Sequence, residues 1–117
     1  MSTFQISNRK NGDIVILDIS GELDAHTAPS LEEAITGLIG QNEHRIIVNC
    51  TSLEYISSAG LGVFMAYIED VRELGGDIKL AEMKPSVYNV FDLLGFPTLY
   101  DILEKETEAV AKFNEND

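Results

Sequence analysis

Two adjacent serines, Ser57 and Ser58, stand between an apolar run and the start of a helical pattern, where a hydroxyl group can take part in phosphate chemistry. Residues 45–50 are almost continuously apolar, which predicts a buried strand, and an apolar pattern of helical period begins at Leu61. A helix leaves its first N–H groups without partners, and its dipole places partial positive charge at that end. A serine at this turn is therefore well placed to accept a phosphate.

The small side chains of residues 57–60 leave the first helical amides accessible. A simpler interpretation is that one serine caps the helix with its hydroxyl, since serine before an apolar period is a common helix start. However, neither Gly60 nor Leu61 supplies the glutamate or glutamine of a capping box. Gly60 and Gly62 also weaken a helix by about 1 kcal/mol each relative to alanine. Close approach of another backbone, or of a phosphate, would explain the two glycines.

Other chemistries of a reactive serine find little support. The G-x-S-x-G motif of serine hydrolases is absent, although Ser58, His26 and Asp24 could be brought together across two turns. A histidine in a loop is far more often an ordinary surface residue, and Asp24 is most simply a turn residue that bonds its own backbone. The phosphate-binding loop motif G-x-x-x-x-G-K-[ST] is also absent. We therefore expect neither enzyme activity nor nucleotide binding.

The composition limits the kinds of molecule that the protein is expected to bind. The chain has 117 residues and a formal net charge of −12, and its eight lysines and arginines are scattered, so nucleic acid binding is not expected. Cys50, His26 and His44 are too few for a metal site of the His/Cys type, so neither a metal nor another cofactor is expected. No apolar run approaches the roughly 20 residues of a membrane span. We expect a cytoplasmic protein that does not bind membranes and acts through another protein.

The apolar periods predict a single α/β domain with a mixed sheet, in the order β-β-α-β-α-β-α-β-α, with helices packed mainly on one face. The domain spans residues 1–117, with a core of about 3–113 and a frayed tail at 114–117. Strands are predicted at residues 3–7, 13–19, 45–50, 77–81 and 98–102, and a hairpin turn at 8–12. Helices are predicted from Thr27 or Ala28 to Gly40, from the Ser57–Ser58 turn to Gly75, from Pro85 to Gly95, and over 103–113. In the third of these helices, the predicted buried stripe is Val87, Val90, Phe91 and Leu94.

Ligands of parallel α/β sheets bind at the carboxyl ends of the strands. The turns at residues 21–27 and 57–62 both leave strands in that direction, so we expect them to lie at one end of the molecule.

Five segments, in order and in register, resemble the sequence pattern of STAS-domain anti-sigma factor antagonists. They are residues 21–24, 47–49, 58–63, 75–76 and 90–95, and the similarity runs from about Gly12 to Ile102. The resemblance implies a partner switch. Such a protein binds an anti-sigma factor that is also a serine kinase with a GHKL-type ATP fold, and so frees the sigma factor. Phosphorylation of a serine ends the complex, and a PP2C-type phosphatase restores it.

The resemblance places the phosphoacceptor at Ser58. The family turn is commonly Asp-Ser-Ser/Thr-Gly, whereas here Ser57 replaces the acid and Ala59 replaces the second hydroxyl residue. The partner surface that we expect consists of Asp24, His26, Thr27, Ser57, Ser58, Ala59, Gly60, Leu61, Gly62 and Met65.

The loss of the acid at position 57 leaves a second hypothesis open. Under it, the chain is a STAS-type scaffold in another signalling, transport or lipid-trafficking complex, without control by serine phosphorylation. Under either hypothesis we expect a monomer or a weak homodimer, the latter by edge pairing of residues 3–7.

Overall fold

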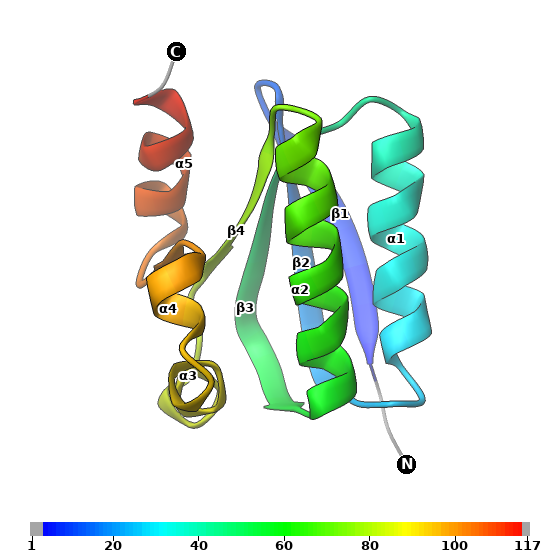
Figure 1. Cartoon of the computed structure of the whole chain (residues 1–117), viewed down its shortest axis with the longest axis vertical. Helices are drawn as coiled ribbons and strands as arrows, with labels where there is room; N and C mark the ends of the chain where they lie inside the picture. Colours follow the sequence, from blue (N-terminus) through cyan, green and yellow to red (C-terminus); the bar gives the residue numbers. More distant parts are fainter. Residues whose placement is uncertain (1–3, 116–117) are drawn as a thin grey trace.

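A five-stranded mixed sheet organises the computed structural model, which describes residues 4–115 (Figure 1). The strands lie in the order β1-β2-β3-β4-β5, with β1 antiparallel to β2 and the other neighbours parallel. Their bounds are β1 Gln5–Asn11, β2 Ile14–Leu23, β3 Arg45–Ile56, β4 Asp77–Ala81 and β5 Ile102–Leu103. The predicted α/β domain with a mixed sheet is confirmed.

The helices are α1 Ala28–Gly40, α2 Ser58–Glu73, α3 Pro85–Leu93, α4 Phe96–Leu99 and α5 Glu106–Asn114. Side chains alternate between the faces of a strand, so Val15, Leu17 and Ile19 of β2 join the core beneath α1 and α2. Ile14 and Ile16 point to the other face, where they pack with residues of α5. The helices therefore lie mainly on one face, as predicted, with α5 as the exception. None of the helices within residues 4–115 is long and apolar enough to cross a membrane.

A row of aromatic rings joins α2 to α3 and α4 inside the main core. The ring centroids of Phe64 and Phe91 are 6.0 Å apart, and those of Phe91 and Phe96 are 5.2 Å apart. Tyr100 extends the row, with its centroid 5.1 Å from that of Phe96. All four side chains are almost fully buried, so α3 and α4 are fixed firmly beside α2.

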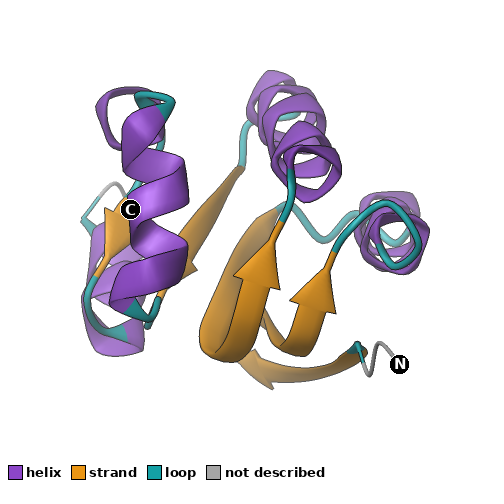
Figure 2. Ribbon diagram, turned by 90° about the horizontal axis from the view of Figure 1, so that it is seen from below, coloured by secondary structure: helices purple, strands orange, loops and turns teal. Residues whose placement is uncertain are grey.

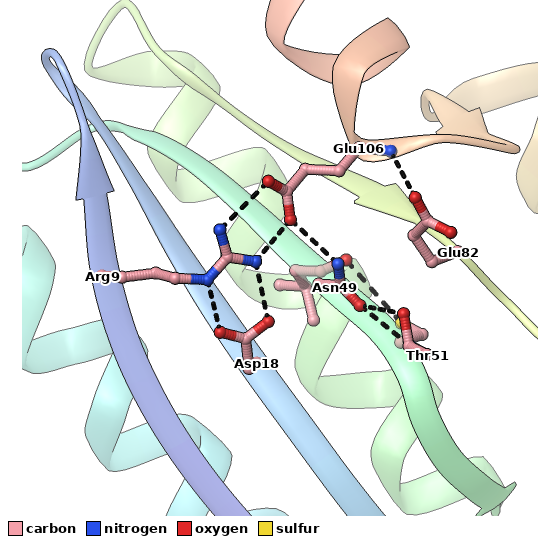
Figure 3. A network of polar contacts seen from close by, with 8 residues as sticks. Arg9, Asp18, Asn49, Thr51, Glu82 and Glu106 are labelled. Carbon is pink, nitrogen blue, oxygen red and sulfur yellow. Dashed lines mark hydrogen bonds and ion pairs between the residues drawn. The ribbon is translucent and has the colours of Figure 1, made fainter.

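A polar network holds α5 against the second face of the sheet (Figure 3). Arg9 of β1 donates to Asp18 at 2.7 Å and to Glu106 at 3.1 Å, and Asn49 of β3 donates to Glu106 at 2.9 Å. The backbone N–H of Glu106 in turn donates to Glu82 at 2.8 Å. The hydrogen bond from Arg9 is the largest influence on the pKa of Glu106, and it lowers that pKa against the opposing effect of burial. The first turn of α5 is thus tied to three residues on and beside the sheet, Arg9, Asn49 and Glu82.

The first three strands are longer than predicted. The hairpin is confirmed, but β1 continues to Asn11 and the turn is confined to residues 12–13, where Gly12 has a φ of 64°. Likewise β2 runs on to Leu23 rather than leaving the sheet at Gly21, and β3 runs to Ile56 rather than ending at Cys50. Gly21, with a φ of 91°, absorbs a register shift, so β2 and β3 stay paired to their ends.

The C-terminal third differs most from the prediction. The strand expected at 98–102 is wrong in most of its length, because residues 96–99 form α4 and only Ile102–Leu103 pair with β4. Pro97 is preset for the first turn of a helix, and Phe96 is buried, so packing favours the helix. Leu94 leaves the predicted buried stripe because α3 has ended, and its side chain is 60 % exposed. Helix α5 includes Asn114, although the sequence pattern predicts a frayed tail from this residue onward. Residues 1–3 and 116–117 lie outside the described part of the chain.

Candidate functional site

The turns that follow β2 and β3 lie side by side, as the sequence predicted. Leu23 at the end of β2 pairs with Ile56 at the end of β3, and the backbone N–H of Ser57 donates to the carbonyl oxygen of Leu23 at 2.9 Å. Figure 2 looks onto this end of the sheet, where the tips of two neighbouring strands continue into two helices on the same face. The site therefore combines the turn before α1 with the start of α2.

The turn before α1 is locked by Asp24 and Thr27. Asp24 Oδ1 accepts hydrogen bonds from the backbone N–H groups of His26 at 2.9 Å and Thr27 at 3.2 Å. The Thr27 hydroxyl accepts from the Asp24 N–H and donates to the Glu22 carbonyl oxygen, both at 2.8 Å. Burial raises the pKa of Asp24, but these donors outweigh it and hold that pKa below its ordinary value. Asp24 is thus an ionised turn residue, which the simpler interpretation of the sequence anticipated.

Ser57 stands at the N-cap position of α2 but does not act as a capping side chain. Its backbone is extended, with φ −103° and ψ 175°, and no side chain bonds the first amides of the helix. The Ser57 Oγ atom is buried and has no hydrogen-bond partner among residues 4–115. The interpretation of Ser57 as a routine capping residue is therefore wrong, and its hydroxyl is hidden from a partner.

Ser58 is the first residue of α2, and its environment is the opposite of that of Ser57. Its side chain is exposed and makes no hydrogen bond within the described part of the chain. It stands beside the first amides of α2, which have no partner in the preceding turn of the helix. Of the two serines, only Ser58 presents its hydroxyl to solvent.

Gly60 and Gly62 lie in the first turns of α2, and the structure explains the two glycines differently. A Cβ atom on Gly60 would lie 2.7 Å from Cγ of Leu23 and 2.9 Å from Cγ1 of Ile56, so glycine is required where α2 packs on the strand ends. A Cβ atom on Gly62 would meet nothing within 4 Å, and this residue is exposed. Close packing within the protein explains Gly60, whereas Gly62 leaves bare backbone on the outer face of α2.

Two members of the expected partner surface belong to the core. Leu61 is 3 % exposed and Gly60 is buried, because both face the ends of β2 and β3. Both residues pack against the strand ends and position the site, and their part in partner binding stays a prediction. Met65, in contrast, is 49 % exposed and follows Ser58 and Gly62 at the spacing of one helix face.

The trio of Ser58, His26 and Asp24 is not assembled as a catalytic group. Asp24 bonds the backbone of the turn, and within residues 4–115 neither the His26 imidazole nor the Ser58 hydroxyl forms a hydrogen bond. The described residues also contain no group of three or more histidine, cysteine, aspartate or glutamate side chains arranged to hold a metal ion.

Sequence reasoning missed three exposed leucines outside the two turns. Leu93, Leu94 and Leu99, at the ends of α3 and α4, are 84 %, 60 % and 62 % exposed. One signal in the sequence could have revealed these exposed leucines. Leu93 and Leu94 are adjacent, and a short helix whose buried face contains Val87 and Phe91 cannot bury two adjacent side chains.

Comparison with known proteins places this arrangement in a family. Residues 5–109 match the STAS domain. The anti-sigma-B factor antagonist of Bacillus subtilis (strain 168) is 32 % identical over 103 residues, which cover 87 % of this chain and 93 % of that protein. The fold and the paired turns define an α/β domain of the STAS class. The chain belongs to the STAS domain family, and within it resembles the anti-sigma factor antagonists.

Solved structures agree on the fold. The anti-sigma factor antagonist SpoIIAA in its unphosphorylated form superposes with a TM-score of 0.79 at 24 % identity, covering 97 % of both chains. The same Bacillus cell fate determinant in its phosphorylated form gives a TM-score of 0.71 at 24 % identity, covering 94 % of this chain and 98 % of that one.

Proposed function

We propose that the protein is an anti-sigma factor antagonist that works by partner switching, with Ser58 as the phosphoacceptor. Unphosphorylated, it binds an anti-sigma factor that is a serine kinase with a GHKL-type fold, and so frees the sigma factor. Phosphorylation of Ser58 ends the complex, and a PP2C-type phosphatase restores it. The observation that carries the proposal is the exposed, unbonded Ser58 hydroxyl at the first position of α2.

Accessibility selects Ser58 over its neighbour. A kinase must bring the γ-phosphorus of ATP within bonding distance of the hydroxyl oxygen, and the buried Oγ of Ser57 offers no such approach. Within residues 4–115 the Ser58 hydroxyl forms no hydrogen bond to a carboxylate, so the base that takes its proton comes from the kinase. Ser58 acts as a substrate residue, and the protein itself has no catalytic role.

A phosphate on Ser58 affects the fold and the interface in opposite ways. It adds nearly two negative charges at the positive end of the α2 dipole, which the helix tolerates. In the complex, the same charges face the nucleotide phosphates of the kinase, where repulsion of buried like charges costs several kcal/mol. The fold persists while binding is lost, which is what a reversible switch requires.

The names of relatives support the proposal. The Bacillus subtilis relative is called an anti-sigma-B factor antagonist, and SpoIIAA is described in unphosphorylated and phosphorylated forms. Transferred to this chain, these descriptions point to the same binding role and the same kind of modification.

The test is incubation with ATP and each anti-sigma factor kinase of the same cell, followed by intact mass and peptide mapping. We expect one phosphate, on Ser58. Ser58→Ala abolishes it, and the matched Ser57→Ala variant retains it because that hydroxyl is hidden. A phosphate on any other residue contradicts the assignment.

A second candidate is a STAS-type scaffold that is not controlled by phosphorylation. The neutral, hidden Ser57 favours it, because the family commonly has an acid at this position that orients the serine or contacts the kinase. Stable binding of a partner, together with no modification by any of the kinases, would select this candidate.

A further inference from the structure

Three leucines stand out on the surface of the described chain. Leu93 is 84 % exposed, Leu94 60 % and Leu99 62 %, more than any other large apolar side chain among residues 4–115. They come from the end of α3, the short connection that follows it and the end of α4, and the two helices are joined only by Leu94 and Gly95. A leucine left in water forgoes the favourable free energy of burying it, so three such exposed side chains indicate a surface that a partner covers.

The backbone that carries these leucines is rigid. Phe91 and Phe96 lie directly beneath it in the buried aromatic row that begins at Phe64 of α2. Gly95, with a φ of 76°, sets the sharp change of direction between α3 and α4. A surface held in this way needs little ordering on binding, which favours affinity.

The leucines border the helix face that begins at Ser58. Arg72 of α2 donates to the carbonyl oxygen of Leu99 at 3.1 Å, and the Tyr100 hydroxyl donates to Glu69 of α2 at 3.3 Å. Glu69 and Arg72 follow Ser58 and Met65 at the spacing of one helix face. In Figure 1, α3 and α4 lie on the side of α2 away from α1. Residues 99 and 100 thus lie beside the C-terminal half of the α2 face that begins at Ser58, about three to four helical turns from that serine.

Two acidic residues lie next to this surface, Asp92 beside Leu93 in the sequence and Glu69 in contact with Tyr100. Within residues 4–115, Asp92 and Glu69 form no ion pair. The nearby cation Arg72 is already occupied, since it pairs with Asp77 at 2.9 Å. A complementary partner therefore presents apolar side chains bordered by lysine or arginine.

We propose that Leu93, Leu94 and Leu99 form the docking surface for the anti-sigma factor kinase, which meets them with an apolar patch rimmed by basic side chains. The inference rests on the proposed function and adds to it a second contact away from Ser58. Near Ser58 the kinase must bring its own nucleotide phosphates, so attraction is weakest there. The leucines supply the binding energy that holds the kinase in place while Ser58 is reached.

The test compares the triple variant Leu93→Ser/Leu94→Ser/Leu99→Ser with Leu74→Ser. Leu74 is a matched control because it is 51 % exposed, at the end of α2 beside Ile39 of α1. Affinity for the anti-sigma factor kinase is measured by calorimetry, and Ser58 phosphorylation by initial rates. We expect the triple variant to bind at least about tenfold more weakly, with a matching rise in KM, and Leu74→Ser to bind like wild type. Circular dichroism and urea unfolding check that each variant is folded.

Two results overturn the inference in distinguishable ways. If the wild type binds and is phosphorylated but the triple variant behaves like Leu74→Ser, the docking surface is wrong and the proposed function stands. If the wild type neither binds nor is modified by any anti-sigma factor kinase, the proposed function fails and the docking surface fails with it. Asp92→Asn gives an independent check. If the rim of the kinase surface is basic, this variant associates with the kinase more slowly than wild type at low salt, and at high salt the two proteins associate at the same rate.

Discussion

Leu23, the last residue of β2, fills the space in which Gly60 has no side chain. An ideal Cβ atom on Gly60 would lie 2.7 Å from Cγ of Leu23, closer than real Cβ atoms approach a neighbouring carbon. The same leucine accepts the backbone hydrogen bond from Ser57 at 2.9 Å. These two contacts of Leu23 therefore fix where α2 begins relative to the strand ends, and so they fix the position of Ser58.

Gly60→Ala tests this contact directly. Alanine should improve the helix by about 1 kcal/mol, but forcing a methyl group against Leu23 and Ile56 costs about 1–3 kcal/mol, so we expect net destabilisation. Gly62→Ala is the control, because nothing lies within 4 Å of the added atom, and it should stabilise the protein by about 0.5–1 kcal/mol. Urea unfolding measures both. Equal effects of the two substitutions would contradict the packing argument.

The order of elements was predictable because local signals punctuate the chain. Asn11 and Gly12 gave the hairpin, and Gly75 with a φ of 90° stops α2 where the sequence indicated. The apolar periods of α1 and α2 also place Leu31, Phe64 and Ile68 in the core. In these segments, local preference and tertiary packing favour the same structure.

The remaining features depend on contacts between distant segments. The second half of β3 carries exposed residues such as Thr51 and Tyr55, so its apolar signal ends at Cys50 although pairing with β2 continues. Burial of the Ser57 Oγ depends on how α2 sits on the strand ends, which no local pattern encodes. The turns of the candidate site were predictable from the sequence, but the choice between its two serines required the structure.

Ser58→Asp should separate folding from binding. An acid in the first turn of α2 interacts favourably with the helix dipole, so we expect unfolding free energy to change by no more than about 1 kcal/mol, in the stabilising direction. Affinity for the anti-sigma factor kinase should fall at least about a hundredfold, because the charge mimics part of the phosphate. Ser58→Ala should bind like wild type. Calorimetry measures the affinity of wild type, Ser58→Asp and Ser58→Ala for the kinase, and thermal melts measure their stability. Retained binding by Ser58→Asp would argue against the switch.

We expect low pH to weaken the contacts that hold α5 against the sheet. Arg9 lowers the pKa of Glu106 in the folded protein from its ordinary value of 4.5. Because this carboxyl titrates at lower pH when folded than when unfolded, its contribution is present above pH 4.5 and is lost as pH falls through the lower value. We expect Glu106→Gln to destabilise the protein by about 1 kcal/mol at pH 7 and by much less in acid. Glu33→Gln, on the exposed face of α1, is the matched control for replacing a glutamate by glutamine, and thermal melts across pH compare the two variants.

The thiol of Cys50 should report whether the contact between Leu23 and Gly60 stabilises the whole domain or only the start of α2. Cys50 is fully buried, and burial raises the pKa of its thiol to about 12, so the folded protein presents almost no reactive thiolate. We expect alkylation by iodoacetamide to be slower than that of the urea-unfolded chain by about a thousandfold or more, because the reaction must wait for opening. If Gly60→Ala weakens the whole domain, its labelling rate rises by the factor that its loss of unfolding free energy predicts. If the substitution disturbs only the start of α2, labelling stays at the wild-type rate while urea stability still falls, which would show that Cys50 and the site open separately.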